Sequence, residues 1–114
     1  MKFSFSKYVW FDGKFVPLSK AKVPITTHAI HYGTSIFEGI RGYWSSKNLY
    51  IFRLNDHVKR FRNSGKFYNI TFNFSDKQIE NAVLNLCKKN KIKESCYIRP
   101  FYFVSQLGIN LHVT

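Results

Sequence analysis

Apolar and polar positions in the first half of the chain predict two β-hairpins. Residues 8–17, "YVWFDGKFVP", place two apolar runs on either side of Asp12-Gly13. This dipeptide favours a type I′ turn, in which both central residues need positive φ. Residues 39–53 predict a second hairpin with "GIRGYW" and "LYIFR" as its strands and "SSKN" as its turn.

The next segment, "DHVKRFRNSGKFY", has apolar positions at helical spacing and predicts a helix. We expect Asn55 or Asp56 to cap its N-terminus. The side that packs on the core is expected to contain Val58, Phe61, Gly65 and Tyr68.

A second helix is predicted to begin after Ser75, which forms a capping box with Gln78. It is expected to end in "KKN", where cations suit the carbonyl end of the helix dipole. Its apolar stripe consists of Ile79, Ala82, Val83, Leu86 and Cys87.

Residues 96–104, "CYIRPFYFV", are rich in aromatic and β-branched residues and predict a strand. Pro100 cannot donate to a ladder, so we expect an edge strand or a bulge there. Two hairpins, two helices and a strand predict an α+β domain, with a mostly antiparallel sheet covered on one face by the two helices.

Composition supports one globular domain of 114 residues, because 45% of them are hydrophobic and 18% aromatic. The N-terminal "MKFSFSKYVWFDG" lacks signal-peptide features, and no apolar run reaches the roughly 20 residues of a membrane span. Cys87 and Cys96 fit no metal or disulfide pattern. We therefore expect a cytoplasmic protein with reduced cysteines and no membrane partner.

The net charge of +12 raises the alternative of a basic binding module for nucleic acid. Thirteen lysines and five arginines are scattered among nine asparagines. No basic segment carries a base-stacking or groove-reading motif, so a nucleic-acid partner is not expected. The last residues, "VSQLGINLHVT", stop in a mixed run without a cap or a terminal element, which leads us to expect a fragment.

Residues 28–44, "HAIHYGTSIFEGIRGYW", hold the most unusual mixture of residue types. His28 and His31 could be combined with His57 as a metal site. Structural metals need about three or four correctly spaced ligands, and no third ligand is placed by a motif here. We therefore expect turn or packing roles for the histidines and no metal site. Residues 33–35, "GTS", resemble half of a phosphate cradle at the start of a short helix. An ordinary helix turn between strands explains them equally well.

Three arginines, Arg41, Arg60 and Arg99, offer planar recognition of a carboxylate or phosphate. Arg99 lies among apolar residues of the last strand, and Tyr97 projects to the same face. A hydroxyl and a guanidinium on one face suit a carboxylate ligand. The alternative is an edge-strand charge that discourages aggregation.

Four blocks of the chain together resemble one enzyme family. The strongest is "HAIHYGTSIFEGIR"; it is preceded by "YVWFDGKFVPLSKAKVPITTHAIHYG", which overlaps it, and followed by "FRLNDHVKRFRNSGKFY" and "YIRP". They are similar to the N-terminal small domain of branched-chain amino-acid aminotransferases, which are fold-type IV pyridoxal-phosphate enzymes. D-amino-acid aminotransferases and aminodeoxychorismate lyases, of the same fold type, remain as alternatives.

The resemblance implies roles for individual residues. Arg60 would bind the phosphate of pyridoxal 5'-phosphate. Phe37 would line the pocket for a branched aliphatic side chain, with Gly39 leaving room beside it.

For the polar groups of the substrate, the resemblance implies that Tyr97 holds the α-carboxylate. Arg99 would bind the side-chain carboxylate of glutamate when glutamate is the amino donor. Tyr32 and Leu111 would reach the pocket of a neighbouring subunit, so a dimer-based homo-oligomer is expected. The substrates would be leucine, isoleucine or valine with 2-oxoglutarate.

The same resemblance limits what residues 1–114 can do alone. In this family the lysine that forms a Schiff base with the cofactor lies beyond "YIRP" in a larger C-terminal domain, as do the main cofactor anchors. None of the thirteen lysines here matches it. We assign no catalytic residue and expect the isolated chain to be inactive.

Overall fold

The predicted N-terminal hairpin is present in the computed structural model, which describes residues 4–105. Strand β1 (Tyr8–Phe11) pairs antiparallel with β2 (Lys14–Pro17). Asp12 and Gly13 have φ values of 49° and 88°, as a type I′ turn requires. A short 3₁₀ helix (Leu18–Lys20) follows the hairpin.

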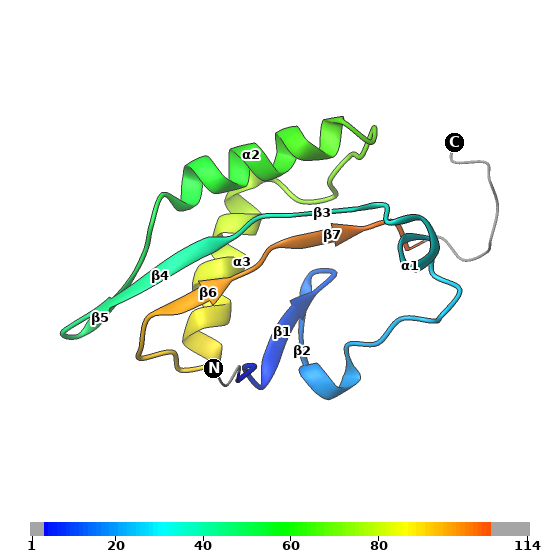
Figure 1. The fold of residues 1–114 in the computed structure, drawn as a ribbon. Helices are drawn as coiled ribbons and strands as arrows, with labels where there is room; N and C mark the ends of the chain where they lie inside the picture. The colour runs from blue at the N-terminus through cyan, green and yellow to red at the C-terminus, as the bar shows by residue number, and fades with distance from the viewer. Residues whose placement is uncertain (1–3, 106–114) are drawn as a thin grey trace.

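The remaining strands form two small antiparallel sheets that run end to end. One sheet has the order β5-β4-β6 and the other pairs β3 with β7. Figure 1 shows β3 leading into β4 along one line and β6 leading into β7 beside it. We call β3, β4, β6 and β7 together the long ribbon. The five strands of the two sheets are β3 (Ser35–Phe37), β4 (Ile40–Ser45), β5 (Asn48–Ile51), β6 (Cys96–Ile98) and β7 (Phe101–Phe103).

A break divides the long ribbon where Glu38-Gly39 lies opposite Arg99-Pro100. The expected single strand over residues 96–104 is therefore two strands. Pro100 has no N–H for the ladder, but its carbonyl accepts a hydrogen bond from the Glu38 N–H at 3.0 Å. The predicted irregularity at Pro100 is confirmed, and it aligns with an irregularity in the facing strand.

The second hairpin is tighter than predicted. Ser45 pairs with Asn48, so the turn has only Ser46 and Lys47 between the strands in place of the four residues "SSKN". Ser46 adopts a φ of 54°, which allows this short connection.

Helices α2 (Leu54–Lys66) and α3 (Asp76–Lys89) contact each other and cover one face of the sheet structure. The capping box at the start of α3 is confirmed, with hydrogen bonds between Ser75 and Gln78 at 2.8 and 3.1 Å. The predicted stripe of α3 is buried at Ile79, Ala82, Val83 and Cys87, whereas Leu86 is half-buried.

The predicted start and one core position of α2 are wrong. Arg53, with a φ of 52°, occupies the N-cap position. Asn55 and Asp56 lie inside the first turn, so neither caps the helix, and Asp56 accepts a hydrogen bond from the Arg53 side chain at 2.8 Å. Tyr68 lies beyond the last residue of the helix and is exposed, whereas Val58, Phe61 and Gly65 are buried as expected.

The unusual stretch begins with a short helix, α1 (His28–Tyr32), which ends at Gly33. Gly33 has a φ of 65°, and its N–H donates to the Ala29 carbonyl at 2.8 Å. Residues 33–35 therefore end a helix and enter β3. The expected helix start at "GTS", and with it the half phosphate cradle, is wrong.

The core lies between the long ribbon and the two helices. Ile36 and Ile40 point toward the helices, and Ile40 has no exposed surface. Aromatic rings extend this core, since Phe72 stacks on Phe61 at 5.1 Å and meets Tyr102 edge-on at 5.2 Å between ring centroids. The opposite face of the ribbon is open, and the residues beside the break point alternately to these two faces.

Candidate functional site

The break in the long ribbon places Phe37, Glu38 and Gly39 at the centre of two groups of side chains. Successive residues of an extended chain point to opposite faces. Glu38 points toward the helices and is only 4% exposed, whereas Phe37 points away and is 53% exposed. Three consecutive residues thus contribute to a helix-side group and an open-face group.

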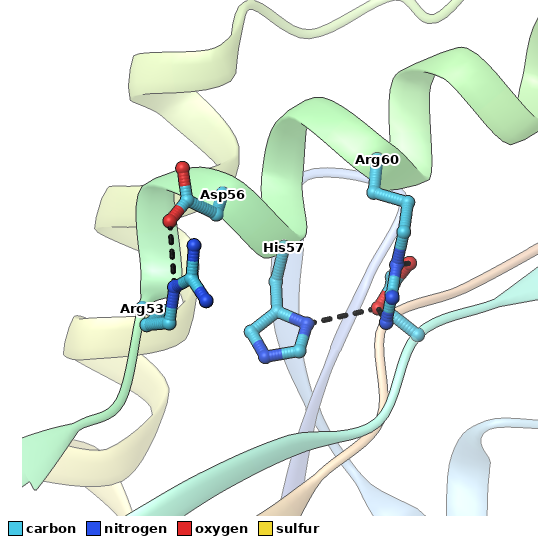
Figure 2. A network of polar contacts seen from close by, with 5 residues as sticks. Arg53, Asp56, His57 and Arg60 are labelled. Carbon is cyan, nitrogen blue, oxygen red and sulfur yellow. Dashed lines mark hydrogen bonds and ion pairs between the residues drawn. The ribbon is translucent and has the colours of Figure 1, made fainter.

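The helix-side group joins Glu38 to two basic residues of α2. Arg60 donates from Nε to Oε1 at 2.6 Å and from Nη2 to Oε2 at 2.8 Å. The Nδ1 atom of His57 lies 2.9 Å from Oε2. Figure 2 shows His57 and Arg60 projecting from the same side of α2, because residues three apart share a helix face.

These contacts keep the Glu38 carboxyl ionised. The hydrogen bonds from Arg60 lower its pKa below the ordinary value, burial acts in the opposite direction, and the His57 hydrogen bond lowers it further. The same pairing raises the pKa of Arg60. Arg60 therefore stays cationic while its side chain remains 68% exposed.

A groove of about 480 Å³ lies beside this pair. Within residues 4–105 the Nη1 atom of Arg60 has no hydrogen-bond partner. An exposed guanidinium edge at a groove fits a phosphate group. The lining residues are Phe52, Arg53, Asp56, His57 and Arg60.

The open-face group contains four of the residues assigned by resemblance. The Arg99 guanidinium lies 3.9 Å from the centroid of the Phe37 ring, a cation–π contact. A Cβ atom on Gly39 would lie 2.9 Å from the Tyr97 hydroxyl, so the glycine allows the tyrosine to pack against the strand. Phe37, Gly39, Tyr97 and Arg99 thus lie together, with Tyr97 57% exposed.

The other assigned residues lie elsewhere. Arg60 is on the helix side and is separated from the open-face group by the strand itself. Tyr32 is on α1, where its ring packs against His28 at 4.4 Å between centroids and a tilt of 35°. No hydrogen bond or ring contact in the described part of the chain joins Tyr32 to the open-face group. Leu111 lies outside the described residues.

His28 and His31 have local polar partners. The Nδ1 atom of His28 lies 2.9 Å from the Thr34 hydroxyl, and Nε2 of His31 lies 2.9 Å from the Ile25 carbonyl. Across residues 4–105, no three His, Cys, Asp or Glu side chains gather as metal ligands do. Nor does that range contain a helix of the length and apolarity needed to cross a membrane.

The two cysteines are free. Burial raises the pKa of the Cys87 thiol to about 11, which keeps it protonated at neutral pH. Burial also raises the pKa of Cys96. A protonated thiol is a poor nucleophile, so neither cysteine is a candidate for covalent chemistry.

Sequence reasoning missed the role of Glu38 and assigned His57 only to packing. Two signals were available. Glu38 is the one acidic residue between Asp12 and Asp56. It also interrupts an apolar alternation at Ile36 and Ile40, where a third core residue would be expected.

Comparisons with known proteins identify the family. The family model "Amino-transferase class IV" matches residues 35–112. A branched-chain-amino-acid aminotransferase of Salmonella typhimurium is 41% identical over 105 residues, covering 92% of this chain and 34% of the relative. The chain thus spans about a third of the length of the curated relatives it matches.

Two solved structures are similar to this chain in three dimensions as well as in sequence. The branched-chain aminotransferase of Thermoproteus uzoniensis with norvaline has a TM-score of 0.90 and 38% identity, covering 96% of this chain and 37% of that one. The T.th. branched-chain amino acid aminotransferase complexed with N-(5'-phosphopyridoxyl)-L-glutamate has a TM-score of 0.84 and 42% identity, covering 91% and 35%. Because the family model spans most of the sequence, the chain belongs to the class IV aminotransferases.

Proposed function

We propose that this chain forms the small-domain wall of a branched-chain aminotransferase active site. The enzyme would move an amino group between leucine, isoleucine or valine and 2-oxoglutarate. The observation that carries the proposal is the open-face group, which combines an exposed aromatic ring, a guanidinium stacked on it and a tyrosine hydroxyl. The norvaline and phosphopyridoxyl-glutamate bound by two structural neighbours support both substrate types.

Each open-face residue has a proposed part in binding. Phe37 supplies apolar surface for an aliphatic side chain, and Gly39 leaves room for the Tyr97 ring. Tyr97 donates its hydroxyl to the substrate α-carboxylate. Arg99 binds the second carboxylate of glutamate, so the same surface serves an apolar and an anionic side chain.

Pyridoxal 5'-phosphate is the proposed cofactor, and it supplies the electron sink that amino-group transfer needs. Arg60 would hold its phosphate through the exposed guanidinium edge. A larger C-terminal domain would provide the catalytic lysine and the main cofactor anchors. Tyr32 and Leu111 are proposed to reach the pocket of a second subunit in a dimer-based assembly.

The test replaces Arg99 with alanine in the complete enzyme that contains this chain. The two half-reactions, with glutamate and with leucine, are followed separately by the absorbance of the cofactor. We expect kcat/KM for glutamate to fall at least about tenfold more than kcat/KM for leucine, because only glutamate loses a charged hydrogen bond.

Lys93→Ala, an exposed cation just before β6, is the matched control and should leave both half-reactions unchanged. Equal losses for the two substrates in the Arg99 variant would contradict the proposed role of Arg99. Activity of the complete enzyme on D-alanine alone would overturn the branched-chain assignment.

A further inference from the structure

Glu38 occupies a position where packing alone favours an apolar residue. Ile36 and Ile40, two residues away on either side, point to the same face and are buried. A carboxylate between them is costly to bury unless it is paired and hydrogen-bonded. The residue at this position therefore contributes something that an isoleucine would not, and its contacts identify what that is.

The geometry of the pair leaves one side of the Arg60 guanidinium available. Glu38 accepts hydrogen bonds from Nε and Nη2, which form one edge of the planar group. The edge formed by Nη1 and the second hydrogen of Nη2 remains for another bidentate acceptor. Arg60 itself lines the groove, together with Phe52 and Arg53.

His57 fixes the carboxylate in turn. An ionised carboxylate only accepts hydrogen bonds, so the Nδ1 atom of His57 must carry the hydrogen in its 2.9 Å contact with Oε2. The Glu38 carboxylate is thereby held from two sides. An exposed arginine without such a partner would sample many side-chain conformations.

We propose that Glu38 is a positioning residue that holds Arg60 in the orientation needed to bind the cofactor phosphate. This inference rests on the proposed function, because it assumes that Arg60 meets a phosphate. The direction in which cofactor affinity changes on neutralising Glu38 distinguishes this role from a simple charge effect. A negative charge near a phosphate site repels the ligand, so charge alone predicts tighter binding when Glu38 is neutralised. Positioning predicts weaker binding.

The experiment measures the Kd of pyridoxal 5'-phosphate by equilibrium dialysis and the ³¹P NMR shift of the bound phosphate, both in the complete enzyme. Glu38→Gln should raise the Kd about tenfold, the scale on which loss of an orienting hydrogen bond weakens a bound group. The ³¹P signal should move toward that of free cofactor. Glu38→Asp keeps the charge but shortens the side chain, so it should give a smaller loss.

Glu80→Gln is the matched control, because the Glu80 carboxylate also bonds α2, through Asn55 at 2.9 Å, but lies outside the groove lining. It should leave the Kd and the ³¹P shift unchanged. A Kd for Glu38→Gln and Glu38→Asp equal to or below that of the wild type would overturn the positioning role.

A double-mutant cycle with Arg60→Ala separates the two proposals. If Glu38 acts through Arg60, Glu38→Gln should have no further effect on the Kd or the ³¹P shift in the Arg60→Ala background. An equal effect in both backgrounds would mean that Glu38 acts only through the general fold and would overturn the inference. Wild-type affinity in Arg60→Ala itself would instead overturn the phosphate role of Arg60 and thus that part of the proposed function.

Discussion

Neighbouring residues at the ribbon break contribute to two separate groups of side chains. Phe37 presents an aromatic ring to the open face, and the next residue, Glu38, binds Arg60 on the helix side. The strand separates the proposed substrate surface from the proposed phosphate contact. Recognition of the side chain and recognition of the phosphate can therefore be altered independently by mutation.

Gly39→Ala should displace the Tyr97 ring. A Cβ atom there would lie 2.9 Å from the Tyr97 Oη and 3.0 Å from Cε2, which is too close for unchanged side chains. Since Tyr97 is exposed, we expect it to move, at a cost of about 1 kcal/mol in the free energy of unfolding in urea. In a Tyr97→Ala background the same substitution should cost nothing, and a full penalty there would refute the clash.

Glu38 should make stability depend on acid. Its lowered pKa keeps it ionised in the native state at a pH where the unfolded chain, with a pKa of about 4.3, binds a proton. The contribution of Glu38 to the free energy of unfolding is therefore complete above the unfolded pKa and is lost as the pH falls through the lower native pKa. The difference in urea midpoint between wild type and Glu38→Gln should shrink below about pH 4.

Glu80→Gln is again the reference for this pH series, because Glu80 lies outside the Glu38–Arg60–His57 group. The difference in urea midpoint between Glu80→Gln and the wild type should not change with pH in the way expected for Glu38→Gln. A Glu38→Gln difference that stayed constant from about pH 7 to about pH 3 would contradict the lowered native pKa.

At the scale of helices and strands, the sequence predicted correctly those features that depend on residues close together in the chain. The Asp12-Gly13 turn and the Ser75 capping box are recognisable because their residues lie within a few positions of one another. The start of α2 was not recognisable, since the helix begins at Leu54 after a cap residue, Arg53, that has positive φ and makes no side-chain cap bond. The periodic pattern of apolar residues from which the helix was predicted does not indicate at which residue the helix begins.

Long-range pairings explain what sequence reasoning missed. The ribbon break depends on Pro100 facing Glu38, 62 residues apart in number, through a bond from Glu38 N to Pro100 O. The contact of Glu38 with His57 and Arg60 exists only because α2 packs over the strand. Resemblance supplied the open-face residues, whereas alternation alone indicated only that Tyr97 and Arg99 share a face.

Ser75→Ala should destabilise the protein through α3. The hydroxyl accepts a hydrogen bond from the Gln78 N–H at 3.1 Å, and its loss leaves a helix-terminal donor without this partner. We expect the free energy of unfolding in urea to fall by about 1 kcal/mol. Ser19→Ala, at an exposed position of the 3₁₀ helix, should change it by less than about 0.5 kcal/mol, and equal effects would argue against the cap.

At the scale of the whole molecule, the proposed function gives this chain one wall of an active site that other parts of the enzyme complete. It spans about a third of its curated relatives. Aromatic side chains on the open face remain about half exposed, at Phe37, Tyr43, Tyr50, Tyr97 and Phe101. In the proposed enzyme this face meets the cofactor and substrate, and other parts of the protein complete the enclosure.

The 114-residue chain alone should therefore show no transamination. With pyridoxal 5'-phosphate, leucine and 2-oxoglutarate present, we expect no glutamate above a protein-free control, because no lysine matches the family's catalytic position. Chromatographic quantification of glutamate provides the measurement. Leucine-dependent turnover by the pure chain would contradict the requirement for a second domain.

The alternation across the ribbon break also limits how this segment can change during evolution. Inserting one residue between Ile36 and Phe37 would exchange the two faces for the residues that follow, turning Phe37 toward the core and the Glu38 carboxylate toward the open side. Both proposed binding functions would be lost together. Related enzymes should therefore diversify their substrate range here by substitution at a constant segment length, whereas hairpin turns remote from the break can vary in length.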